Sequence, residues 1–73
     1  MKNDYVEELI LAVKNKAEND AKLCTYIICT MAGSEEAYNT FGSTKKAFEV
    51  ATKYVNECDS FGDALEKFKN EIL

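Results

Sequence analysis

The hydrophobic positions of this chain fall into five clusters, and one of them has no broad polar face. In the segment Ala21–Ala32, nine of the twelve residues are apolar. A helix without a wide polar face is expected at the centre of a bundle, so residues of about 20–32 are predicted to form a central apolar helix. The run from Thr25 to Thr30 also has strand propensity, which leaves its type open. Helix is favoured because no other segment alternates with a period of two and could pair with a lone strand.

The remaining segments have helical periodicity and recognisable starts and stops. The first helix is expected to begin at Asn3 or Asp4, since Asp4 and Glu7 have the spacing of a capping box. Ser34 and Gly42 bound a stretch of about two turns. Two amphipathic helices follow, one after the cap Ser43 or Thr44 and one after the cap Ser60. We therefore predict an all-α fold, a small bundle of four helices plus one short helical turn, in a single domain of residues 1–73.

The central helix is predicted to bury a broad arc and to present a second, less apolar face. The arc expected in the core consists of Leu23, Cys24, Ile27, Ile28, Met31 and Ala32, and the second face of Lys22, Tyr26, Cys29 and Thr30. The short segment 34–42 is expected to turn Ala37, Tyr38 and Phe41 inward. We expect the second face to be covered either by this short segment or by another chain.

Length and charge narrow the function classes. The core of a 73-residue chain rarely gives a folding stability above about 3–5 kcal/mol unless a disulfide, a metal or a partner chain adds to it. A partner chain would therefore add stability. The formal net charge is −4 and every cation is lysine, which disfavours nucleic acid as a partner. The apolar run is too short to span a bilayer. We expect a cytoplasmic protein of a bacterium, or of a host cell if a phage encodes it.

The residue types that carry chemistry do not form a recognisable constellation. The chain has no histidine, and its three cysteines, Cys24, Cys29 and Cys58, have spacings that match no metal-ligand pattern. Neighbouring carboxylates such as Glu35 and Glu36 fall at predicted helix starts, where acids favour the helix dipole. The sequence therefore predicts no enzyme activity, no cofactor and no metal.

What remains is a non-catalytic small acidic helical protein that acts by binding another protein, as a regulator, an inhibitor or an assembly subunit. A homodimer is the simplest version, because it would bury apolar surface and stabilise a small core. The candidate partner-binding residues are Leu11, Tyr26, Tyr38 and Phe41. For Tyr38 and Phe41 the alternative is that both rings cover the core, and for Leu11 it is simple exposure to solvent.

A second function class is a DNA-binding regulator that uses residues 35–57. The stretch from Ala37 to Thr44 resembles the turn of a helix-turn-helix motif, in which a glycine follows an alanine by four residues. Here Gly42 follows Ala37 by five, so the register differs. The candidate recognition helix also combines three lysines with two glutamates, and phosphate binding depends on several uncompensated cations.

Overall fold

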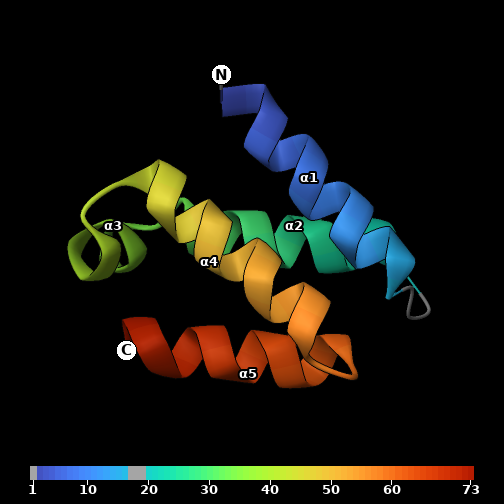
Figure 1. Ribbon diagram of the computed structural model, residues 1–73. Coiled ribbons are helices and arrows are strands. Elements are labelled where there is room, and N and C mark those ends of the chain that lie inside the picture. The colour runs from blue at the N-terminus through green and yellow to red at the C-terminus, as the bar shows by residue number, and fades with distance from the viewer. Residues whose placement is uncertain (1, 17–19) are drawn as a thin grey trace.

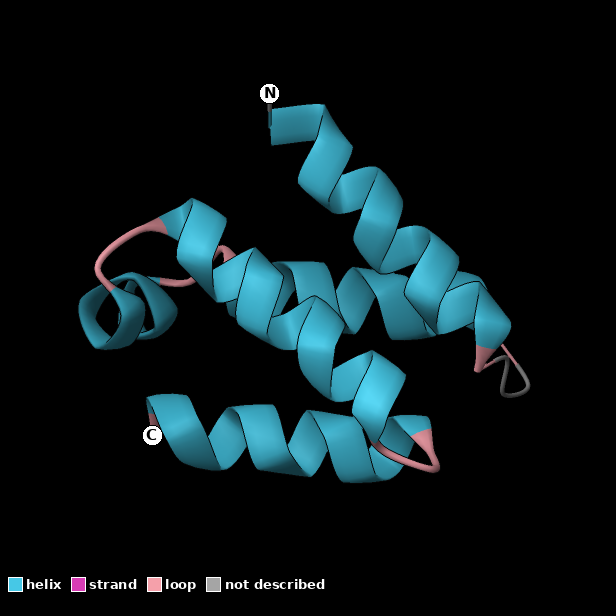
Figure 2. Cartoon of the chain, viewed as in Figure 1, coloured by secondary structure: helices cyan, strands magenta, loops and turns pink. Residues whose placement is uncertain are grey.

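The computed structural model describes residues 2–16 and 20–73, with the side chains of 6–16 and 20–73, and this part of the chain folds into helices alone. They are α1 (Lys2–Asn15), α2 (Ala21–Ala32), α3 (Glu35–Phe41), α4 (Thr44–Glu57) and α5 (Phe61–Ile72). Figure 2 shows the described residues as helices and loops, with no strand among them. The predicted all-α fold is confirmed, and so is the helical assignment of the apolar run in α2.

Each of the last four helices begins at a side chain that caps its free backbone amides. The Asp20 carboxylate accepts a hydrogen bond from the Leu23 amide at 3.0 Å. The hydroxyls of Ser34, Ser43 and Ser60 accept corresponding bonds at 3.2, 3.1 and 3.1 Å. These caps are among those predicted, while the alternative cap Asn19 lies outside the described residues. The first helix begins at Lys2, so Asn3 and Asp4 both lie inside the helix and the prediction that it starts at one of them was wrong.

The helices α1 and α5 pack on opposite sides of α4, while α2 lies behind it and α3 closes one end (Figure 1). Both α4 and α2 contact every other helix, so α2 is central as predicted, but it shares that place with α4. The Cα atoms span 31 × 27 × 18 Å. The smallest extent corresponds to about two layers of helices, since packed helix axes lie about 8–10 Å apart and Cα atoms lie about 2.3 Å from each axis. Such a thin bundle leaves every helix a face towards solvent.

The core lies where these helices meet. Its largest fully buried side chains are Leu9, Val13, Ile28, Val55 and Phe68. Alanines at positions 47 and 51 give α4 a narrow inner face that its neighbours can approach closely. The Phe41 ring of α3 stacks on Phe68 with centroids 5.7 Å apart, and the Tyr54 ring meets the same phenylalanine edge-on. One aromatic cluster therefore joins α3, α4 and α5.

Candidate functional site: the outer face of α2

The outer face of α2 exposes large apolar side chains. Tyr26 is 69% exposed and Leu23 is 54% exposed. Residues three apart on a helix are neighbours on its surface, so these two side chains form one patch. The prediction that Leu23 faces the core was wrong, because α2 buries only the narrower strip of Cys24, Ile28 and Ala32. The helix is too thinly covered in this bundle for its whole apolar arc to be buried.

A groove runs beside this patch, between α1 and α2. Its volume is about 460 Å³, and it is lined by Ile10, Lys14, Ala21, Lys22, Thr25, Tyr26 and Cys29. The lining is mostly apolar. The hydroxyl of Thr25 donates a 2.7 Å hydrogen bond to the Ala21 carbonyl within α2. We call this groove together with Leu23 the Tyr26 surface.

Cys29 adds to the apolar character of the Tyr26 surface. Its side chain is half-buried, and burial raises the pKa of the thiol above its ordinary value. The uncharged thiol therefore dominates at neutral pH, and a protonated cysteine behaves as a small hydrophobe. A raised thiol pKa also lowers the fraction of nucleophilic thiolate. Cys29 thus suits an apolar contact better than covalent catalysis.

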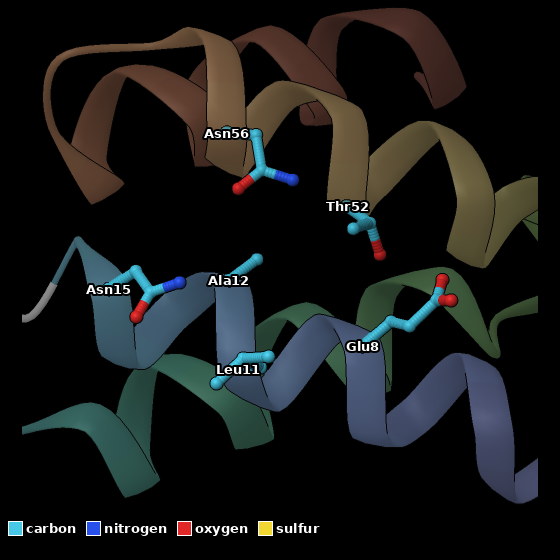
Figure 3. A pocket seen from close by; sticks show the side chains of 6 residues that line it. All are labelled: Glu8, Leu11, Ala12, Asn15, Thr52 and Asn56. Atoms are coloured by element: carbon cyan, nitrogen blue, oxygen red, sulfur yellow. The ribbon is translucent and has the colours of Figure 1, made fainter.

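A second groove, between α1 and α4, contains the candidate residue Leu11. Figure 3 shows side chains from the two helices facing one another across it, and its volume is about 220 Å³. The residues that line it are Glu8, Leu11, Ala12, Asn15, Thr52 and Asn56. Leu11 is 60% exposed, as the sequence predicted. It is the one large apolar side chain among polar neighbours, so this groove is smaller and more polar than the Tyr26 surface.

The structure separates the two aromatic candidates of α3. Phe41 is half-buried and stacked on Phe68, so its ring belongs to the core edge. Tyr38 is 53% exposed, so the prediction that it turns inward with Phe41 was wrong. Leu11, Tyr26 and Tyr38 thus lie on three different helices. The groove beside Leu11 and the groove beside Tyr26 each contain only one of them.

Sequence reasoning missed two exposed leucines, Leu23 and Leu73. Leu23 could have been found from the width of its arc, since a helix in so small a bundle cannot bury 180° of its surface. Leu73 follows α5 and lines a third groove of about 300 Å³ with Thr30, Met31, Ser34, Glu36, Lys69 and Ile72. Charges of both signs line this third groove, which distinguishes it from the other two.

The described residues contain no group of three or more His, Cys, Asp or Glu side chains placed to hold a metal ion. The three cysteines, all within the described ranges, form no disulfide. Of the helices that the structure describes, none has the length and apolar character needed to cross a bilayer.

Comparison with protein-family models, with curated proteins and with solved structures finds no significant match.

Proposed function

We propose that this chain is a non-catalytic protein-binding module that acts as a regulator, an inhibitor or an assembly subunit, and that its partner binds at the Tyr26 surface. The observation that carries the proposal is the adjacent exposure of Leu23 and Tyr26 beside an apolar groove. Single exposed apolar residues are ordinary on a protein surface, whereas a contiguous patch beside a groove is typical of interaction sites. Tyrosine is also enriched among residues that dominate binding energy.

The size of the protein supports the same proposal. The folded chain exposes 4740 Å² and has a core of mainly small side chains, several of them alanines. Anything that binds the folded state alone stabilises it by mass action. A partner on the Tyr26 surface would therefore both cover apolar area and raise the melting temperature. We place the activity in the cytoplasm as part of the proposal, because three cysteines without disulfides suit a reducing compartment.

The DNA-binding alternative has less support. The helix α4 would be the recognition helix, but it packs against every other helix of the bundle. Its exposed positions include Lys45, Lys46, Lys53, Glu49 and Glu57, for a net charge of +1. A helix that is this central and this weakly charged offers little to a phosphate backbone. We therefore do not advance DNA binding as a second function.

Site-specific photocrosslinking in cells of the source organism tests the proposal. A benzoylphenylalanine is placed at position 23 or 26, and the control carries it at Asn70, an exposed position on α5. We expect covalent adducts with one protein species from positions 23 and 26, identified by mass spectrometry, and none from position 70. Adducts that are absent from both α2 positions, or that form equally from position 70, would contradict the proposal.

A further inference from the structure

The groove of the Tyr26 surface is lined by positively charged side chains, whereas the whole chain has a negative net charge. They are Lys14 on α1 and Lys22 on α2, one on each of the two helices that line the groove. The whole chain carries a formal net charge of −4. By contrast, the groove beside Leu11 is lined by a single charged residue, Glu8, and the groove beside Leu73 has both Glu36 and Lys69. Of the three grooves, this one alone combines an apolar lining with cations only.

We propose that this groove binds an acidic amphipathic helix of a partner protein. The apolar stripe of that helix packs against Ile10, Tyr26 and Cys29, and carboxylates on its two flanks reach Lys14 and Lys22. Lysine stems can line apolar surface while their ammonium groups stay at the rim, which is where flanking carboxylates would meet them. This inference rests on the proposed protein-binding function and names the chemistry of the partner.

The architecture favours a helix over an extended segment. A strand binds by adding to the edge of a sheet, and the described part of this chain has no sheet. A groove between two helices instead accepts a third helix through apolar anchors at i, i+3 or i+4, and i+7. Two lysines are too few for a nucleic-acid backbone, which needs several uncompensated cations, but they suffice to select acidic over basic peptides.

Selection from displayed random peptides tests the inference without assuming a partner. The full chain is immobilised, and a library of peptides of about 16 residues, which is long enough for four helical turns, is selected on it. We expect the enriched peptides to have an apolar stripe of helical period with Asp or Glu on its flanks. Their dissociation constants are then measured by fluorescence anisotropy at two salt concentrations, and we expect weaker binding at the higher salt.

Matched variants connect binding to the groove. The double variant Lys14→Glu/Lys22→Glu reverses the charge at the rim of the groove. The control Lys46→Glu/Lys53→Glu makes the same change at exposed positions of α4 that line none of the three grooves. Each Lys→Glu change removes two units of charge, so both variants go from −4 to −8. We expect about tenfold weaker binding or more for the rim variant and a much smaller change for the control. Tyr26→Ala should weaken binding by a similar factor while Tyr38→Ala does not.

The outcomes separate this inference from the proposed function. Selected peptides that lack acids, or that bind the two double variants equally, would overturn the acidic helix. A concentration-dependent dimer in light scattering that Tyr26→Ala abolishes would also overturn it, because a second copy would then occupy the groove. If the crosslinks from positions 23 and 26 persist in either case, the protein-binding function stands. If those crosslinks are absent as well, both proposals fall.

Discussion

The hydrogen bond between Tyr54 and Glu71 makes the attachment of α5 to α4 measurable. The Tyr54 hydroxyl donates to Glu71 Oε1 at 2.5 Å, and the Tyr54 ring is 8% exposed. A hydrogen bond to a charged group contributes about 1.5–3 kcal/mol to stability. Because Glu71 is itself exposed, we expect the lower end of this range for Tyr54→Phe, a loss of about 1.5 kcal/mol. For a domain of this size that lowers Tm by roughly 6–12 °C.

The same bond gives the stability a defined pH dependence. Hydrogen bonding to Glu71, helped by burial and by nearby negative charge, raises the pKa of Tyr54 from 10.0 to about 12. Between these values the folded state keeps a proton that the unfolded state has lost, so stability falls as pH rises. The contribution is complete below pH 10 and is lost as pH approaches 12. Two pKa units correspond to at most about 3 kcal/mol, and solvent around the Tyr54 hydroxyl and Glu71 reduces this figure.

Urea denaturation followed by circular dichroism measures both effects, since the chain has no tryptophan to report by fluorescence. The cycle of Tyr54→Phe, Glu71→Ala and the double variant isolates the pair, and the phenylalanine keeps the ring over which Lys67 Nζ lies at 5.0 Å. Three results would contradict a stabilising bond between Tyr54 and Glu71. They are a stability of Tyr54→Phe within about 0.5 kcal/mol of wild type, a coupling energy of zero, and a loss of stability between pH 10 and 12 that is as large in the variant as in wild type.

Two further pairs of substitutions test the description of the fold by the same unfolding measurement. Phe41→Ala should cost about 2–3 kcal/mol because its half-buried ring stacks on the core, whereas Tyr38→Ala on the same helix should change stability by less than about 0.5 kcal/mol. Equal losses would mean that both rings cover the core. Gly42→Ala should cost about 1 kcal/mol because Gly42 has φ +87°. Gly62→Ala should gain about 0.5 kcal/mol, because Gly62 lies in α5 and an added Cβ would meet its nearest neighbour, Ser60 Oγ, at an ordinary contact distance of 3.8 Å. Changes of the same sign would show that the left-handed conformation of Gly42 is not the cause.

The sequence predicted what local chemistry controls. Helix starts at Asp20, Ser34, Ser43 and Ser60 follow from the need of the first amides for an acceptor, and the capping side chains meet that need. The left-handed end of α3 at Gly42 follows in the same way from the conformational freedom of glycine. The two amphipathic helices after Ser43 and Ser60 were also predicted correctly, because each has one clear apolar stripe.

The sequence failed where the outcome depends on which helices meet. It predicted correctly that α2 is central, from the apolar content of that segment, but it did not predict that α4 shares this position, because sharing it also requires a face that neighbours can approach closely. The helix α4 meets that requirement with Ala47 and Ala51 on its inner face, so it accepts contacts from every other helix. Tyr38 and Phe41 were likewise inseparable by pattern. Only the position of Phe68 on α5 decides that Phe41 is the ring that packs.

The candidate site lies on α2, an apolar helix that the core buries only in part. The segment with the highest apolar content supplies Leu23 and Tyr26, two of the five large apolar side chains exposed in the described part of the chain. Packing does not explain Tyr26, which is 69% exposed. Helix propensity does not explain it either, because an aromatic side chain loses rotamer freedom in a helix and alanine or lysine would serve better at a solvated position. A side chain that neither the core nor the helix requires supports the proposed contact with a partner, and the lysines beside it are the basis for proposing an acidic one.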